Sequence, residues 1–153
     1  MSGLCDFDFL LGRWNVRHRR LRQRGRGCLD WDELTGTAET RPLLGGLCNV
    51  EEHRIDGSAF SGVAFRCFDK SADTWAIYWV SESSGALEPP VIGGFDGEEG
   101  IFEGEDNDGG RPVKVRFIWR RGTHGLPNWE QAFSYDEGRT WETNWIMEFQ
   151  GAD

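Results

Sequence analysis

The chain has 153 residues, a length that suits one domain, because a chain of about 150 residues buries roughly 68–70% of its unfolded surface around one core. Its formal net charge of −9 argues against nucleic acid and anionic membranes as partners, since both attract an excess of Lys and Arg. The sequence contains neither a basic, apolar leader nor a run of about 18 apolar residues, so we expect a cytoplasmic protein.

Large aromatic side chains dominate the apolar content. The sequence has eight Trp and ten Phe, and such side chains bury about 150–250 Å² each. At roughly 25 cal/mol/Å², one fully buried Trp contributes about 4–6 kcal/mol before conformational entropy is subtracted. Eight Trp exceed what a small core requires. Two interpretations stay open: some of them line a cavity, or all of them fill the core and close the ends of a barrel.

The first predicted element is a short apolar turn at residues 7–11. A strand follows it directly and begins with Gly12 and Trp14. No other stretch carries apolar residues at helical spacing between helix caps. What recurs instead are short runs rich in β-branched and aromatic side chains, separated by Gly and Pro. These runs predict strands at residues 12–22, 28–40, 46–55, 59–68, 74–82, 91–96, 100–105, 112–121, 128–136 and 140–149.

Short strands joined by tight turns predict an antiparallel meander, because no connection is long enough for a parallel crossover. Such a meander exposes its edges unless it closes on itself. We therefore expect an all-β fold, a single antiparallel up-and-down barrel of about ten strands over residues 1–153, rather than a sandwich. The prolines fall in loops or at strand starts, where a missing N–H does no harm. Residues 83–90 and 106–111 are the expected mobile loops.

Arginines crowd the first strand and the turn after it: Arg13, Arg17, Arg19, Arg20, Arg22, Arg24 and Arg26. One interpretation is a patch that contacts phosphate groups. The alternative is a hairpin in which the returning strand brings Asp30, Asp32 and Glu33 alongside the arginines, where each pair adds about a few tenths of a kcal/mol. Because the whole chain is acidic, we favour the hairpin.

Polar residues at alternate positions of two strands form the main candidate site. Trp14, His18 and Arg20 share one face of the first strand, and Glu51 and His53 share one face of the third. If Trp14 points inward, a carboxylate, an imidazole and a guanidinium converge inside the barrel. They would bind an acidic head group there, or support acid–base chemistry.

The alternative is a structural role for the same side chains. His18 and Arg20 would then pair with Asp32 and Asp30 on the neighbouring strand, and His53 would lie at the rim. Since side chains alternate strictly along a strand, a slip of one residue would turn His18 outward. The sequence leaves both interpretations open.

The four cysteines are Cys5, Cys28, Cys48 and Cys67, about twenty residues apart. They include no Cys-x-x-Cys pair, and no His lies at zinc-binding spacing from them. This spacing matches no disulfide or zinc framework. We expect four free thiols in reducing surroundings and no metal site. His124 lies in a loop and is expected to be exposed, and Lys114 and Arg116 are expected to point outward from their strand.

A turn near the C-terminus, formed by Ser134, Asp136, Gly138, Thr140 and Trp141, has the residue types and spacing of an Asp-box hairpin. Asp136 is expected to accept hydrogen bonds from the turn, and Gly138 to take a positive φ. A propeller would repeat the box about every 40–50 residues. Because the sequence holds a single copy, it excludes a propeller and any glycosidase function inferred from this motif.

Further residues fit one pattern: Phe7-x-Phe9-Leu10-Leu11-Gly12-x-Trp14, Gly62 before Phe65, Asp69 to Trp75 leading into Tyr78-Trp79-Val80, Gln131, the 134–141 turn, and Asn144-Trp145-Ile146-Met147. With these residues the chain resembles the lipocalin-like (calycin) superfamily, and within it an uncharacterised bacterial family of cytoplasmic barrels. The resemblance implies a barrel and no assigned reaction. Its looser relatives include haem-binding nitrobindins, fatty-acid binders and a few barrel decarboxylases or cyclases, so fold does not define activity. We expect no haem cofactor, because a nitrobindin-type site needs an imidazole near the C-terminus and residues 141–149 contain none.

The sequence thus predicts a barrel that binds a small apolar or aromatic molecule, acidic ones included. The predicted ligand contacts are Trp14, His18, Arg20, Glu51, His53, Trp79, Trp119, Trp129 and Trp145. Two alternatives stay open: a barrel enzyme that uses His18, His53 or Glu51 as acid or base, and a structural or assembly module with a filled interior. No phosphate-binding loop, nucleophile elbow or zinc-protease motif occurs. A homodimer is compatible with each of these functions.

Overall fold

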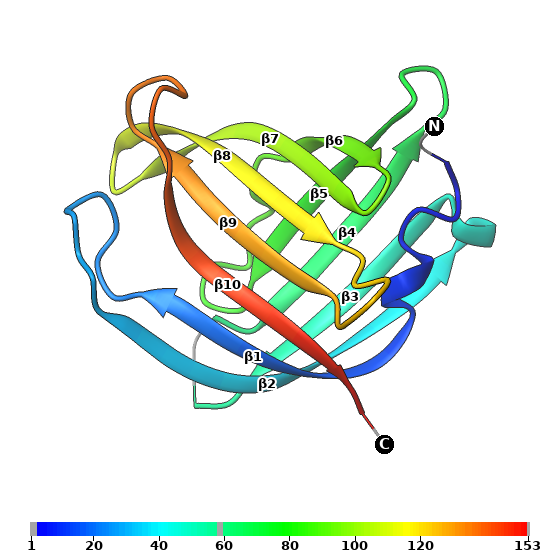
Figure 1. Cartoon of the computed structure of the whole chain (residues 1–153). Helices are drawn as coiled ribbons and strands as arrows, with labels where there is room; N and C mark the ends of the chain where they lie inside the picture. Colours follow the sequence, from blue (N-terminus) through cyan, green and yellow to red (C-terminus); the bar gives the residue numbers. More distant parts are fainter. Residues whose placement is uncertain (1–2, 58–59, 153) are drawn as a thin grey trace.

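The computed structural model describes residues 3–57 and 60–152. Each strand pairs antiparallel with the next along the chain, and β1 also pairs with β10, which closes a ten-stranded barrel (Figure 1). The strands are β1 (Gly12–Leu21), β2 (Trp31–Leu43), β3 (Cys48–Ile55), β4 (Gly62–Asp69), β5 (Thr74–Ser81), β6 (Val91–Asp96), β7 (Glu99–Asp108), β8 (Arg111–Arg120), β9 (Asn128–Ser134) and β10 (Glu142–Gly151). Two 3-10 turns, η1 (Asp8–Leu10) and η2 (Leu44–Gly46), are also present. The predicted all-β, up-and-down barrel with a short N-terminal helical turn is confirmed.

Side chains of β1 alternate between the interior and the solvent. Val16 and His18 are buried, whereas Arg17 between them is exposed. The pairing with β10 holds this register, since His18 lies opposite Met147, which is also buried. The slip that would turn His18 outward therefore does not occur.

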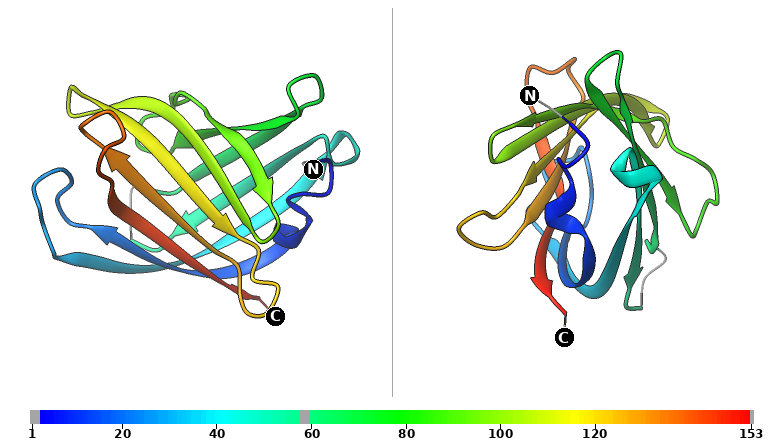
Figure 2. Two further views of the ribbon diagram at one scale, coloured as in Figure 1. Left: turned by 45° about the horizontal axis from the view of Figure 1, so that its top comes forward. Right: turned by 90° about the vertical axis from the view of Figure 1, so that its right-hand side faces the viewer.

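The turn η1 closes one end of the barrel (Figure 2, right). Phe7 and Leu10 are buried there, and the ring of Phe7 packs edge-on against Trp75 with 4.9 Å between ring centroids. The indole N–H of Trp14 donates a hydrogen bond of 2.8 Å to the carbonyl oxygen of Leu10. The apolar start of the chain is therefore a plug, held in place by the first residues of β1.

The expected mobile loop at residues 106–111 is instead a tight hairpin, and this prediction was wrong. β7 and β8 pair as far as Asp108 and Arg111. The two residues between them, Gly109 and Gly110, have φ values of 58° and 87°. Two-residue hairpin turns of this kind need positive φ at both central positions, which glycine adopts without strain.

Pro42 was expected in a loop, but it lies within β2, opposite Asn49 of β3. On the other side of β2, the pairing with β1 ends at Gly12 and Thr40. At Pro42, strand β2 therefore has no pairing strand on the side where β1 lies. A sheet tolerates proline at such an edge position.

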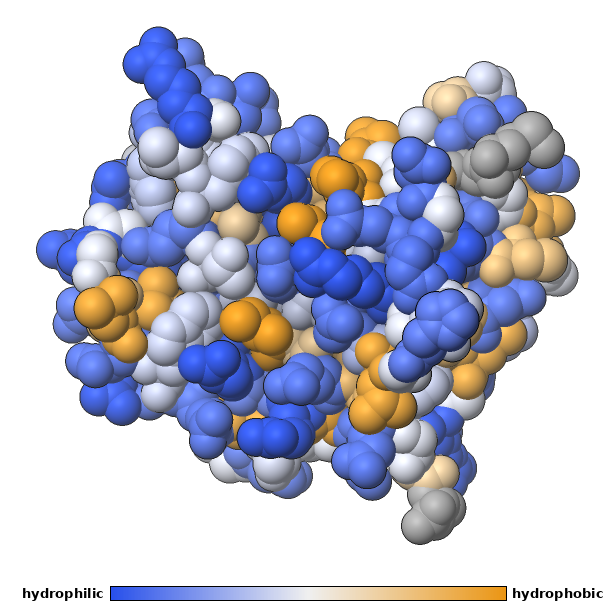
Figure 3. Space-filling view, viewed as in Figure 1, coloured by the Kyte–Doolittle hydropathy of each residue, from blue (hydrophilic) through white to orange (hydrophobic). Residues whose placement is uncertain are grey.

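Carboxylates accompany the arginines of the first hairpin. Arg13 pairs with Glu39 at 2.7 Å, and Arg22 pairs with Asp32 at 2.8 Å. Both pairs lie on the surface, where an ion pair contributes about 0–1 kcal/mol. The face of the molecule seen in Figure 3 is mainly hydrophilic, with separate small apolar patches. Of the predicted carboxylates, only Asp32 therefore forms an ion pair with an arginine of this hairpin among the described residues.

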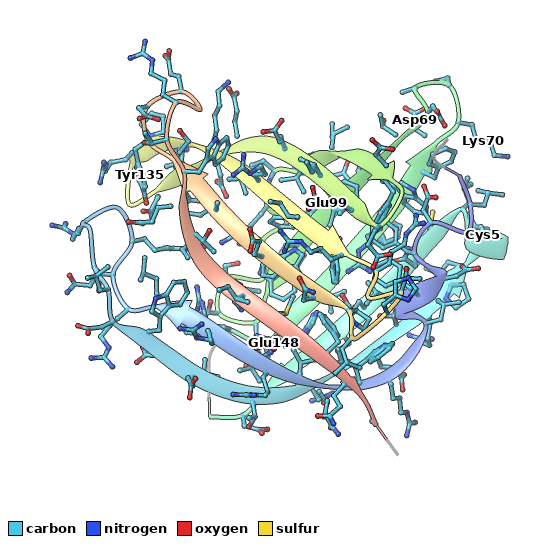
Figure 4. All side chains as sticks on the ribbon, in the orientation of Figure 1. Cys5, Asp69, Lys70, Glu99, Tyr135 and Glu148 are labelled. Carbon is cyan, nitrogen blue, oxygen red and sulfur yellow. The ribbon has the colours of Figure 1, made fainter. Side chains whose placement is uncertain are left out.

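The turn between β9 and β10 is built around Asp136. Its carboxylate accepts hydrogen bonds from Thr140 Oγ1 at 2.6 Å, from Thr140 N at 2.9 Å and from Ser134 Oγ at 2.8 Å. These bonds lower the pKa of Asp136 to about 2. Tyr135, which Figure 4 labels beside this turn, donates a hydrogen bond of 2.6 Å to Asp108. The turn is thereby tied to the β7–β8 hairpin.

In the described part of the chain, no helix is long and apolar enough to cross a membrane. The four cysteines are free thiols. His124 is exposed, as is Lys114, whereas Arg116 is half-buried because its guanidinium lies 4.2 Å from the ring centroid of Trp141.

Candidate ligand-binding cavity

A cavity opens at the end of the barrel opposite η1. Its outer part, which we call the vestibule, has a volume of about 460 Å³, and it lies among the ends of strands, beside Arg20 of β1, Ser81 of β5 and Phe133 of β9. Its inner part, the inner chamber, has a volume of about 60 Å³. The two parts share the lining residues Ile77, Trp79, Glu88, Phe117, Gln131 and Trp145, so they lie directly next to each other.

The polar floor of the inner chamber is centred on Glu51, whose side chain is fully buried. One carboxylate oxygen accepts hydrogen bonds from Arg66 Nη2 at 2.5 Å and from His53 Nε2 at 3.1 Å. The other accepts a hydrogen bond of 2.9 Å from the hydroxyl of Thr40. Arg66 Nη1 in turn donates to Asn49 at 2.8 Å. Alternation on three adjacent strands, β2, β3 and β4, places all five side chains on the inner face.

Opposing effects set the charge of this floor. Burial would raise the pKa of Glu51, but the Arg66 guanidinium and His53 together hold it well below its ordinary range. Glu51 is therefore ionised, and its ion pair with Arg66 carries no net charge. The Glu51–Arg66 pair therefore offers hydrogen-bonding groups to a ligand without a net charge.

Three polar atoms of the inner chamber have no hydrogen-bond partner among the described residues: His53 Nδ1, Arg66 Nε and Trp119 Nε1. All three side chains are buried and line the chamber. Because His53 uses its Nε2–H toward Glu51, its neutral form presents Nδ1 as an acceptor, while Arg66 and Trp119 present N–H donors. More than nine in ten buried polar groups in proteins are paired, so these three atoms are exceptions in the interior of the barrel.

Tryptophans form the wall above the floor. Trp145 packs edge-on against Trp79 at 6.1 Å and against Trp129 at 5.4 Å between ring centroids. Trp119 and Trp129 lie 6.3 Å apart. The sequence predicted these four residues as ligand contacts, and the structure brings them together around the inner chamber.

The structure separates two other predicted contacts from the cavity. Trp14 lies at the closed end, bound to Leu10 and packed edge-on against Phe149 at 6.1 Å. His18 points inward, but it lines neither part of the cavity. Instead its Nδ1 accepts a hydrogen bond of 3.1 Å from the indole N–H of Trp145, so His18 positions a wall residue.

His18 is neutral in the folded protein. Burial, followed by the charges of His53 and Arg20, lowers its pKa to about 3. Since Nδ1 accepts the Trp145 hydrogen bond, the proton of the neutral ring is on Nε2. The predicted pairing of His18 with Asp32 does not occur, because Asp32 binds Arg22 on the surface.

Arg20 lies at the mouth, where it lines the vestibule. Its guanidinium carbon is 3.5 Å from the ring centroid of Phe60 and 4.4 Å from that of Trp145. Nε and Nη1 have no hydrogen-bond partner, and no carboxylate among the described residues forms an ion pair with Arg20. Burial and the neighbouring Arg24 lower its pKa to about 10, so it stays charged at neutral pH.

Sequence reasoning missed Arg66, Thr40 and Asn49 on the floor, and Glu88 at the junction of the two parts. Burial and the nearby Asp106 raise the pKa of Glu88. The available signal was alternation: Arg66 falls two residues after Ala64 in a predicted strand, and both belong to the inner face.

In the described ranges, no group of three or more His, Cys, Asp or Glu side chains is placed to hold a metal ion. No protein-family model matches the sequence, and a search of curated proteins finds no similar one. Inferences about function therefore rest on the geometry of the cavity.

Proposed function

We propose that the protein binds a small amphipathic molecule inside the barrel, with its apolar or aromatic body against the tryptophan wall. The observation that carries this proposal is the vestibule at the open end of the barrel, which shares Trp79 and Trp145 with the adjoining inner chamber. The vestibule volume of about 460 Å³ falls in the range of roughly 300–1,000 Å³ that is usual for ligand sites. A filled interior, as a purely structural module would have, is harder to reconcile with this space.

Charge suggests which way the ligand lies. The inner chamber carries the compensated Glu51–Arg66 pair, whereas Arg20 at the mouth is a cation without a carboxylate partner in the described ranges. Glu88, Glu105 and Asp106 also line the vestibule, so Arg20 is the position there that attracts an anionic group, and a neutral polar group fits the floor. We infer a ligand with an acidic group at the vestibule end of an apolar body.

We also propose a protein superfamily and a cellular compartment for this chain. A ten-stranded up-and-down barrel with an N-terminal 3-10 plug supports membership of the lipocalin-like superfamily. The free thiols are compatible with a cytoplasmic protein, because disulfides are rare in reducing compartments.

One observation favours a second function, that of a barrel enzyme. Glu51 holds His53 through Nε2 at 3.1 Å, which leaves Nδ1 without a hydrogen-bond partner among the described residues. A carboxylate that orients an imidazole is a common arrangement for a general base. Turnover of a bound ligand, lost on His53→Gln with binding retained, would favour this function over binding alone.

Binding can be tested with a matched pair of fluorescent probes, 1-anilinonaphthalene-8-sulfonate and the uncharged N-phenyl-1-naphthylamine. We expect both to bind saturably at one site, to quench Trp fluorescence and to raise the melting temperature by mass action. Ala64 lines the inner chamber, so Ala64→Leu should weaken both probes. Ala76→Leu, on the outer side of β5 between the inward Trp75 and Ile77, is the control and should not. Linear, non-saturating signals that ignore Ala64→Leu would contradict the proposal.

A further inference from the structure

Cys48 of β3 and Cys67 of β4 face each other directly across two neighbouring strands. Their sulfur atoms are 3.4 Å apart. In the adjoining residue pair, the amide of Phe68 donates a hydrogen bond of 2.9 Å to the carbonyl oxygen of Leu47. Hydrogen-bonded and non-hydrogen-bonded pairs alternate along an antiparallel ladder, so the two cysteines form a non-hydrogen-bonded pair.

This type of pair suits a disulfide. The Cα atoms of non-hydrogen-bonded partners lie about 4.5 Å apart, and a disulfide spans Cα atoms that are roughly 4.4–6.8 Å apart. The sulfur atoms need to approach only until they bond, without a shift of either strand along its neighbour. Neither of the other two thiols shares this arrangement, since Cys28 bonds to the backbone of Asp30 and Cys5 is exposed.

The two thiols lie on the outer side of the barrel wall. Their chain neighbours Asn49 and Arg66 point inward, where they are hydrogen-bonded on the floor of the cavity, so Cys48 and Cys67 point outward. Cys67 is partly exposed, whereas Cys48 is only 8% exposed. A small oxidant therefore reaches Cys67 first, with Cys48 directly opposite on the neighbouring strand.

We propose that Cys48 and Cys67 form a site of reversible oxidation that reacts with small disulfides such as glutathione disulfide. The Cys67 thiolate attacks one sulfur of glutathione disulfide, which breaks the S–S bond and releases one glutathione. The Cys48 thiolate then attacks the Cys67 sulfur of the mixed disulfide and releases the second glutathione. Two protein thiols are oxidised, and one glutathione disulfide is reduced to two thiols.

The reaction is slow at neutral pH and accelerates in alkali. Burial and the hydrogen bond with Cys48 raise the pKa of Cys67 to about 11. Because the thiolate is the attacking species, the rate of the first step rises about tenfold per pH unit from pH 7 to pH 9. The product cross-links the β3–β4 hairpin, which restricts the unfolded chain and raises the melting temperature.

The test uses the Cys5→Ser/Cys28→Ser variant, which keeps only the two thiols in question. After incubation with glutathione disulfide, intact mass should fall by two hydrogen atoms, and peptide mapping should join Cys48 to Cys67. Dithiothreitol should restore both thiols. Adding Cys48→Ser should instead trap a stable glutathione adduct on Cys67, because the resolving thiol is gone.

Three results would overturn the proposal. They are two unreacted thiols at pH 9 in excess glutathione disulfide, a stable glutathione adduct while Cys48 is present, or disulfides between chains in place of the internal bridge. None of these readouts depends on whether the barrel binds a ligand, so the two proposals fail independently.

Discussion

Arg20 is the residue expected to make the cavity bind an anionic ligand more tightly than an uncharged ligand of similar shape. It lines the vestibule as a charged group without an ion-pair partner among the described residues, and a hydrogen bond to a charged group contributes about 1.5–3 kcal/mol. Arg20→Gln should therefore weaken 1-anilinonaphthalene-8-sulfonate by about tenfold to a hundredfold, and N-phenyl-1-naphthylamine far less. Arg17→Gln is the control, because Arg17 lies on the same strand and is exposed. Equal losses for both probes in fluorescence titration would show that Arg20 acts by packing alone.

His18 should make the stability of the fold depend on pH. Its pKa is about 3 when folded and about 6.5 in an unfolded chain. Below pH 6.5 this imidazole takes up a proton in the unfolded state but not in the folded state. The free energy of unfolding therefore decreases as the pH is lowered, by up to about 1.4 kcal/mol per pH unit. Glu51, whose pKa is lowered, adds a loss only below its own ordinary range. Glu88, whose pKa is raised, acts in the opposite direction, so the contribution of His18 is read from the comparison with a His18 variant between pH 6.5 and pH 5.

Urea denaturation across that window measures the effect. His18→Gln keeps an acceptor for the Trp145 indole and should flatten the slope of stability against pH. His124→Gln, in an exposed loop, should leave the slope as in the unchanged protein. If wild type and His18→Gln lose stability in parallel, the buried neutral imidazole is not the cause.

At the scale of the elements, local pattern was enough to locate every strand of the barrel. Turn residues and β-branched or aromatic runs are local signals, and the structure has a strand at each predicted place. The ends were less predictable, because pairing decides them: β7 continues to Asp108 since β8 is there to pair with it. The inward direction of His18 and Arg20 also followed from alternation.

The contents of the site were only partly predictable, because they depend on contacts between strands. Arg66, Glu51 and Thr40 meet across β4, β3 and β2, and a single strand's pattern cannot reveal which side chains its neighbours bring. Trp14 shares its face with His18, but strand β1 runs from the closed end to the open end, so its first residues belong to the plug.

Strands β2 and β3 approach each other so closely at Gly36 that any side chain there would clash with β3. A Cβ on Gly36 would lie 2.1 Å from the carbonyl oxygen of Arg54 on β3. Gly36→Ala should therefore lower the free energy of unfolding by about 1–3 kcal/mol. Gly151→Ala is the matched control near the end of β10, where no atom lies within 4 Å, and it should change stability by less than about 0.5 kcal/mol. Indistinguishable urea midpoints for the two variants would refute the packing argument.

The whole molecule is a barrel with unlike ends. Phe7 and Leu10 of the N-terminal plug are buried at one end, while the vestibule lies among the strand ends at the other. The polar floor, built on β2, β3 and β4, lies between these two ends. Under the proposed function, a ligand would enter through the vestibule and keep its acidic group at the mouth, beside Arg20.

A crystal structure of the protein with 1-anilinonaphthalene-8-sulfonate tests this account most directly. We predict the aromatic rings of the probe in the vestibule, against Trp79 and Trp145, with the sulfonate hydrogen-bonded to the Arg20 guanidinium. The uncharged probe should occupy the same space without that contact. Either probe found only on the outer surface, or a barrel interior that stays closed to both at saturating concentration, would contradict the assignment of the cavity as a ligand site.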